Sequence, residues 1–239
     1  MKIYFGDGMK KGKNLIAVLC ASLMVIAILS GFKPVQGDTP VALIKKIVLD
    51  VTFRPSGESD WETAKTGEPL LDGQEVRTGD KSLALVLFTD GSGLLRVREN
   101  SILHVYGKTQ EHRLNKDTFV QKGTVGFEVN KQESEEFKFT TPTAVASIRG
   151  TEGFVGVDDS TTLVAVGKGL VDVLATLGQK QSGSVPAGSV AQVGQDGVVN
   201  IYQMTDAQLK TLQDAGKTHT KKLKIDIKDG VVEIEYFTD

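Results

Sequence analysis

The sequence has few of the residues on which enzyme chemistry or disulfide cross-links depend. Among its 239 residues there are one Cys, one Trp and three His, and the formal net charge is −2. A single Cys excludes an intramolecular disulfide and a cluster of metal-binding thiolates. A net charge near zero argues against a general nucleic-acid binder, which usually presents a basic surface. Aromatic residues are also scarce, at 6%, whereas the 26 glycines favour β structure with many tight turns.

The N-terminal region predicts a secretory signal peptide. Residues 15–29 form an apolar run, preceded by three lysines and followed by the small or aliphatic residues of Val35-Gln36-Gly37. A basic segment, an apolar run and a small-residue site form the pattern of such a leader, and we expect cleavage after Gly37. The protein would then be periplasmic or secreted. The alternative is an uncleaved inner-membrane anchor over residues 15–32, although a full span takes about 20 apolar residues.

Removing residues 1–37 changes the composition of what remains. Cys20 lies in the middle of the apolar run after Leu19, which does not fit a lipid attachment site, so the product would contain no Cys. The leader holds five Lys and one Asp, so the remaining 202 residues carry a net charge of −6. We therefore expect no attraction to DNA or to anionic lipid, and contact with a membrane only if the leader stays uncleaved.

Short apolar runs that alternate with turn signals predict an all-β domain over residues 38–201. Asp-Gly pairs recur at 72–73, 90–91, 196–197 and 229–230, where Gly accepts a positive φ. This spacing of strands predicts an antiparallel β-sandwich or a short β-solenoid. The expected strands are 46–53, 82–89, 94–97, 102–106, 124–129, 136–140, 153–157, 162–166, 170–174 and 189–193.

Residues 202–239 predict a short helix followed by a β-hairpin. Thr205 and Gln208 have the spacing of a capping box at a helix start, and Gly216 gives a stop. After the helix, residues 223–227 and 231–236 alternate apolar and charged side chains around an Asp-Gly turn. We interpret this segment as an appendage that packs on the β domain.

No catalytic, metal-binding or cofactor-binding pattern is present in the sequence. There is no Gly-x-Ser-x-Gly elbow, Walker loop or EF-hand loop, and His104, His112 and His219 lack the spacing of metal ligands. We therefore expect a protein that is not an enzyme and carries no cofactor. A carbohydrate-active enzyme would need two carboxylates that meet on the sheet, within about 10 Å of each other.

Two stretches resemble the FecR-type regulator domain, an exported sensor module of bacterial surface signalling. The first runs from Trp61 to Ser101 and includes Thr78-Gly79, which leads into an apolar strand with Leu83, Leu85 and Leu87; the second is Thr140–Thr151. The resemblance covers roughly residues 45–175 and implies an all-β domain without enzymatic activity. Its motif residues, structural or in contact with a partner, are Trp61, Gly79, Asp90, Gly91, Ser92, Asn100, Pro142, Arg149, Gly150 and Thr151.

Two motif residues have an expected physical role, and two features depart from the family pattern. The Trp61 ring would cover the end of a small core, and Arg149 would be an internal clamp or, alternatively, an exposed ligand contact. An aromatic residue is expected at Gly153 but stands at Phe154, so either a β-bulge shifts the register or Gly153 replaces the aromatic. Only 14 residues precede the apolar run, too few for a cytoplasmic anti-sigma domain, so a role with a sigma factor is not inferred.

These observations predict an exported, non-enzymatic binding or scaffold protein of the bacterial envelope. Its partner would be an envelope protein or a glycan, and its oligomeric state is open. The alternative is a membrane-anchored signalling protein that keeps its N-terminal helix. A carbohydrate-active enzyme is the third hypothesis.

Overall fold

The structure, a computed structural model, covers the β domain and the two C-terminal elements. It describes residues 39–55, 59–110, 113–131, 137–216, 220–227 and 230–237. The predicted signal peptide, its anchor alternative, Cys20, His112 and His219 lie outside the described residues. Within the described ranges, no helix has both the length and the apolar character that crossing a bilayer requires.

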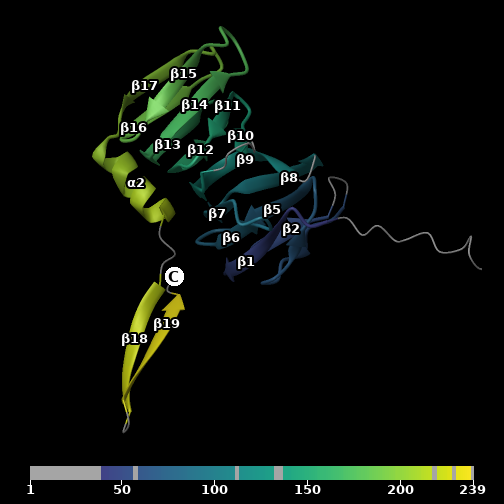
Figure 1. Cartoon of the computed structure of the whole chain (residues 1–239), viewed down its shortest axis with the longest axis vertical. Coiled ribbons are helices and arrows are strands. Elements are labelled where there is room, and N and C mark those ends of the chain that lie inside the picture. The colour runs from purple at the N-terminus through teal and green to yellow at the C-terminus, as the bar shows by residue number, and fades with distance from the viewer. Residues whose placement is uncertain are drawn as a thin grey trace, which may run out of the picture. The chain divides into compact units, whose positions relative to one another are not determined.

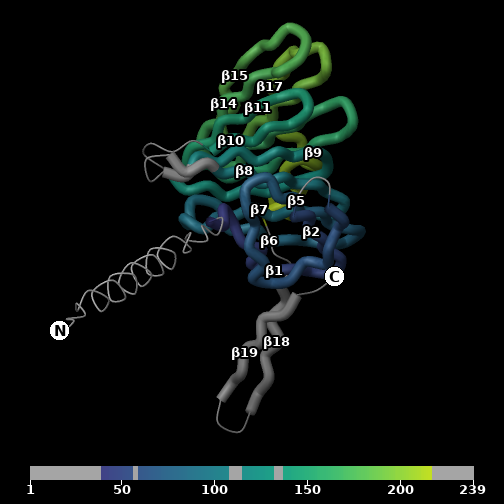
Figure 2. The backbone as a smooth tube through the Cα atoms, turned by 90° about the vertical axis from the view of Figure 1, so that its right-hand side faces the viewer, coloured from purple at the N-terminus to yellow at the C-terminus, as the bar shows by residue number. Residues whose placement is uncertain are grey.

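The β domain is built from two sheets that share one long strand, β9 (Arg113–Val129) (Figures 1 and 2). All neighbouring strands are antiparallel except β9 and β10, which are parallel. In order, sheet A contains β4 (Pro69–Leu70), β1 (Ala42–Val48), β6 (Leu83–Phe88), β7 (Gly93–Val97), the second half of β9, β12 (Glu152–Val157), β13 (Thr162–Lys168), β16 (Ser189–Val193) and β17 (Val199–Gln203). Sheet B contains β3 (Glu62–Thr63), β2 (Val51–Arg54), β5 (Gln74–Thr78), β8 (Ile102–Gln110), the first half of β9, β10 (Phe137–Thr140), β11 (Ala144–Ile148), β14 (Leu170–Ala175) and β15 (Ser182–Pro186).

Strand β9 passes from sheet B to sheet A at Gly123. This residue has a φ of +90°, which only glycine adopts without strain. A Cβ at this position would lie 2.6 Å from the Cα of Ser101, so there is also no space for a side chain. The bend lets one strand pair with β8 and β10 on one side and with β7 and β12 on the other.

The main core fills the space between the two sheets. Phe88 of sheet A packs edge-on against Phe137 of sheet B, with 5.0 Å between ring centroids. Phe127 of sheet A and Phe139 of sheet B make a second contact between the sheets, with tilted rings and 5.2 Å between centroids. The all-β fold is therefore confirmed, and of the two predicted architectures the sandwich is the one that forms.

The outer face of sheet A carries the helix α2 (Asp206–Gly216) (Figure 1). The predicted capping box is confirmed, because the Gln208 amide donates to Oγ1 of Thr205 and the Thr205 amide donates to Oε1 of Gln208. The helix lies over a row of residues that pair across β9, β12, β13, β16 and β17. That row is Gly126, Phe154, Ala165, Val190 and Tyr202.

The predicted C-terminal hairpin is also confirmed as an element. Strands β18 (Thr220–Ile227) and β19 (Gly230–Phe237) form a separate two-stranded antiparallel sheet. Its register sets Leu223 opposite Ile234 and Ile225 opposite Val232.

Several sequence-based boundaries were wrong. The strand predicted over residues 46–53 is two strands in different sheets, because Leu49 adopts a φ of 56° and breaks the run. The list of expected strands did not include the first half of β9, nor β3, β4, β5, β11, β15 and β17. The predicted division of the chain at residue 202 falls inside β17.

The predicted apolar strand is confirmed as β6, and its two faces pack in different places. Ala84, Val86 and Phe88 belong to the main core, whereas Leu83 and Leu85 are buried outside it. Because side chains alternate along a strand, these leucines and Leu87 lie on the outer face of sheet A.

The departure at Gly153 and Phe154 has a structural explanation. The pairing of β12 with β13 shifts between Glu152 and Gly153, which is the bulge that was one of the two predicted alternatives. A Cβ on Gly153 would lie 2.7 Å from the Phe127 ring, so Phe127 occupies the space of the missing aromatic. Phe154 instead faces outward and packs in the smaller core with Ala215 of α2.

Candidate functional site

The two halves of the predicted motif meet at the end of β9. The side-chain amide of Asn130 donates to the carbonyl of Gly91, and the backbone N–H of Asn130 donates to the carbonyl of Ser92. On the other side, the amide of Val129 donates to the carbonyl of Thr151. The Asp90-Gly91-Ser92 turn and the Gly150-Thr151 turn therefore hold the same stretch of backbone, which gives the motif a structural role.

Asp90 also forms an ion pair with a buried lysine, and this pair connects the two sheets. Nζ of Lys116, whose side chain is fully buried in the first half of β9, lies 2.5 Å from Oδ2 of Asp90. Burial alone would raise the pKa of Asp90, but hydrogen bonds from Lys116 and Ser92 outweigh it and hold the pKa below its ordinary value of 3.8. The Asp90 carboxylate, in a turn of sheet A, thus neutralises the ammonium group of Lys116 in sheet B.

This ion pair predicts a loss of stability at low pH. A carboxyl with a lowered pKa in the folded state stabilises the fold above its unfolded pKa and loses that contribution as the pH falls through the folded value. We therefore expect the free energy of unfolding to fall below about pH 4. The double variant D90N/K116M lacks the pair and should show a smaller fall in urea titrations from pH 6 to pH 2. Parallel curves for the two proteins would contradict the prediction.

The other motif residues lie at separate places in the sandwich. Gly79 and Asn100 are joined by a hydrogen bond from the Asn100 amide to the Gly79 carbonyl. Pro142 is exposed between two buried threonines, and Thr143 bonds Oγ1 of Thr162 in sheet A at 2.7 Å. These motif residues therefore hold turns and link the sheets, and the structure does not bring them together into one site.

The two motif residues with a predicted physical role, Trp61 and Arg149, both lie outside the core. Trp61 is outside the core clusters, and its ring stacks with the guanidinium groups of Arg54 at 4.7 Å and Arg77 at 4.3 Å. The ring therefore covers arginines on the outer face of sheet B, not the end of a core. Arg149 is exposed, which agrees better with the predicted alternative of a surface contact than with a clamp inside the core.

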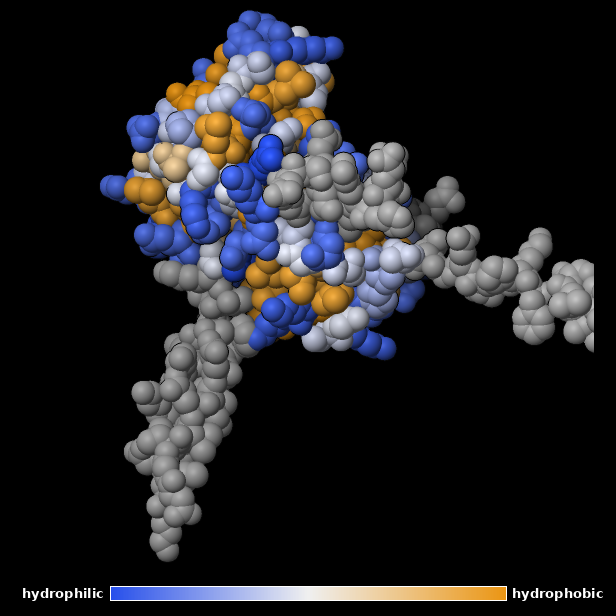
Figure 3. Space-filling view, viewed as in Figure 1, coloured by the Kyte–Doolittle hydropathy of each residue, from blue (hydrophilic) through white to orange (hydrophobic). Residues whose placement is uncertain are grey.

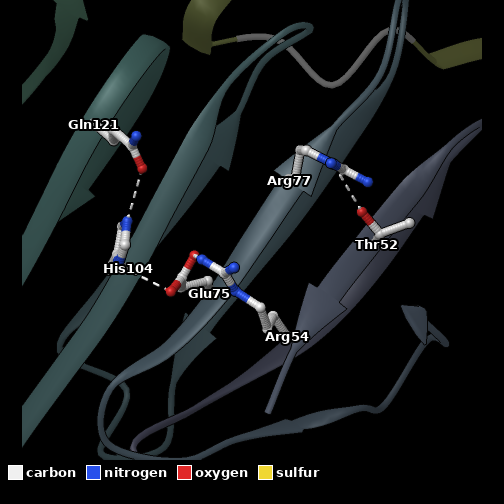
Figure 4. A network of polar contacts seen from close by, with 6 residues as sticks. All are labelled: Thr52, Arg54, Glu75, Arg77, His104 and Gln121. Atoms are coloured by element: carbon white, nitrogen blue, oxygen red, sulfur yellow. Dashed lines mark hydrogen bonds and ion pairs between the residues drawn. The ribbon is translucent and has the colours of Figure 1, made fainter. Parts of the chain in front are cut away.

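A polar network occupies the outer face of sheet B (Figure 4), and it includes the two arginines that stack on Trp61. Glu75 is buried, forms an ion pair with Arg54, and lies 3.5 Å from Nδ1 of His104. Nε2 of His104 lies 3.1 Å from Oε1 of Gln121. His104 is therefore a partly buried structural residue, as its place in an alternating strand indicates. Among the described residues, no group of His, Cys, Asp and Glu is arranged to hold a metal ion.

The same outer face is hollowed into a groove of about 590 Å³ over β9, β10, β11, β14 and β15. The strand register arranges the lining in two rows that run across these strands. One row consists of Thr140, Val145, Leu174 and Ser182, and the row beside it is polar. The polar row consists of Asp117, Lys138, Ser147, Asp172 and Ser184.

The groove offers hydrogen-bonding groups held in place by their neighbours. Thr140 donates to Oδ1 of Asp117 at 2.7 Å, and Ser184 donates to Oδ1 of Asp172 at 2.5 Å. Three strand spacings separate the backbones of the two aspartates, about 14 Å. That distance is much longer than the 5 Å or so between the carboxyls of a retaining glycosidase, so this pair suits binding better than glycoside hydrolysis.

Sequence reasoning did not find the groove. Its charged and hydroxyl residues come from five strands between residues 117 and 184, and each one looked like an ordinary solvent-facing position in a strand. The only available signal was the alternation itself, which marks outward positions but does not show which strands are neighbours.

Comparison with known proteins supports the resemblance noted from the sequence. Residues 74–172 match the family described as FecR protein. This range is therefore identified as a FecR domain. The matched range contains every motif residue except Trp61, and it includes β5 through the beginning of β14. The search of curated proteins found no match.

Two solved structures are similar to part of this chain. Both are crystal structures of a proposed anti-sigma factor from Parabacteroides distasonis, at 2.50 Å and 1.65 Å resolution. Each is 15% identical over 58% of this chain, with TM-scores of 0.49 and 0.48. The alignments span 63% and 64% of those chains, less than two thirds of their length.

Proposed function

We propose that this protein is an exported, non-enzymatic binding module whose FecR domain recognises a segment of another envelope protein in the groove of sheet B. The proposal depends mainly on the outward face of β14. There, Asp172 stands between Leu170 and Leu174, whose side chains are 52% and 49% exposed. Large apolar side chains beside a polar groove are typical of protein contact surfaces.

The chemistry of β14 indicates what the partner segment would contain. Asp172 accepts one hydrogen bond from Ser184 and, as a carboxylate, has further acceptor positions for a cation. A segment with a basic residue between two apolar residues would complement the acid and the two leucines. A glycan is the weaker fit, because the groove is lined by aliphatic side chains and hydroxyls without an aromatic ring.

The proposal of export depends on the N-terminal sequence pattern. Residues 15–29 with the preceding lysines predict the leader, and cleavage would follow Gly37. N-terminal sequencing of the protein from the producing cells tests this directly. A start at Asp38 supports export with cleavage, whereas a membrane fraction that retains residues 1–37 would overturn it in favour of the anchored form.

The binding proposal can be tested by photo-cross-linking in cells that produce the full chain. A photoreactive residue at Ser147, inside the groove, should give a discrete protein adduct. Leu174→Asp and Asp172→Lys should each reduce the adduct at least tenfold, because they remove the apolar contact or reverse the charge.

The chain offers a matched control for each variant. Leu177 is 42% exposed but lies outside the groove lining, so Leu177→Asp should leave the adduct unchanged. Asp159→Lys, in an exposed turn, controls for the change of charge. Equal losses in variants and controls, or no adduct at all, would contradict a protein partner. Retention of the purified protein on an envelope glycan, lost in the groove variants, would identify the partner as a glycan instead.

A further inference from the structure

The outer face of sheet A carries apolar residues that belong to neither of the two hydrophobic cores. Register aligns Leu43, Leu87 and Leu94 in one row across β1, β6 and β7, and Val48 with Leu83 in another. Apolar side chains gather over β1 and β6 in the space-filling view (Figure 3). We name the following six residues the outer patch: Leu43, Val48, Leu83, Leu85, Leu87 and Leu94. All six lie outside both core clusters.

Helix α2 covers only the other half of this face. The row that contains Leu85 continues through Arg96 and Gly126 to Phe154, over which the helix packs. A Cβ on Gly126 would lie 2.4 Å from the carbonyl oxygen of Ala215, so the last turn of the helix touches β9. The next strand beyond β9 on that side is β7, which belongs to the outer patch.

The position of Asp214 also places the end of α2 beside the patch. Burial lowers the pKa of the Arg98 guanidinium, and the Asp214 carboxylate opposes that shift, which requires the two groups to be near each other. Arg98 directly follows β7. The chain therefore leaves the helix within one or two strand spacings of the outer patch, about 5–10 Å.

The hairpin β18–β19 begins four residues after Gly216. Its register places four aliphatic residues on one face, as two opposed pairs: Leu223 with Ile234, and Ile225 with Val232. The opposite face carries Lys222 paired with Glu235 and Lys224 paired with Glu233. An isolated two-stranded hairpin is marginally stable in water, so such an amphipathic hairpin needs an apolar surface to cover.

We propose that the apolar face of this hairpin docks on the outer patch of its own chain and continues the cover that α2 begins. The connection from Gly216 to Thr220 is short, and the end of α2 lies beside β7 and β9, so the outer patch is within reach of the hairpin. Each strand of the hairpin has eight residues, about 26 Å when extended, which is enough to span β1, β6 and β7. The charged pairs would then face water. This inference is independent of the groove on sheet B.

Cysteine cross-linking tests the docking, because the chain has a single Cys that can be removed as C20S. In this background, L87C or L94C, at partly exposed positions of the patch, is combined with I225C or I234C in the full chain. Oxidised glutathione takes up the two thiol hydrogens as it is reduced. At least one pair should form a disulfide within the monomer, seen as a faster-migrating monomer band without reductant.

The control uses K224C, on the opposite face of the same strand. Combined with L87C it should cross-link at least tenfold more slowly than I225C. Equal rates for both faces, or no disulfide in any of the four pairs, would overturn the proposal. A disulfide that appears only in covalent dimers would also overturn it and would identify the hairpin of a second copy as the occupant.

Discussion

Replacing Asp90 by Asn should lower the free energy of unfolding by about 3–5 kcal/mol, because it removes the carboxylate charge that faces the buried ammonium of Lys116. The Lys116 side chain has no exposed surface, so water cannot replace the lost partner unless the fold opens. The Asn side chain keeps the shape of Asp but carries no charge. A loss of this size is a large share of the 5–15 kcal/mol that stabilises a typical domain.

The matched comparison is the double variant D90N/K116M. Replacing both partners removes the uncompensated charge, so its stability should return to within about 1 kcal/mol of the original protein. The single variant K116M should cost less than D90N, since the Asp90 side chain remains 26% exposed and can be hydrated. Urea denaturation followed by circular dichroism measures all three. If D90N and the double variant are equally destabilised, the loss comes from the turn and not from the charge.

This ion pair also shows why sequence reasoning found only part of the fold. The helix α2 could be predicted because its signals, Thr205 and Gln208, are local to the chain. The first half of β9 could not, since Asn115, Lys116 and Asp117 read as a polar segment. In the folded chain Lys116 pairs with Asp90, which the fold brings to it from another sheet. A buried charge of this kind gives no periodic signal, because alternation assigns lysine to the surface.

The candidate site had a similar limit. Motif reasoning selected residues such as Asp90, Gly150 and Thr151, and the structure shows that these hold turns and join the sheets. The groove residues Asp117 and Asp172 belong to no motif, and they share one row only because β9, β10, β11 and β14 are neighbours. Strand order is a property of tertiary packing, which one sequence does not display.

Gly123→Ala should be the most damaging glycine substitution in the long strand, with a loss of about 2–5 kcal/mol in the free energy of unfolding. Part of that loss comes from the φ of +90°, which costs any residue with a Cβ about 1–2 kcal/mol. The rest is overpacking, about 1–3 kcal/mol, since the new Cβ would lie 2.6 Å from the backbone of Ser101. Ser101 cannot yield easily, because it is held by hydrogen bonds with Thr78 and Thr124.

Gly91→Ala provides the control that separates these two contributions. Gly91 also has a positive φ, +71°, but a Cβ there would meet no atom within 4 Å. It should therefore cost only the conformational part, about 1–2 kcal/mol. Chemical denaturation of both variants gives the difference, which measures how tightly the bend of β9 packs on Ser101. Equal losses would mean that Ser101 moves aside, and that the passage of β9 between the sheets depends on backbone conformation alone.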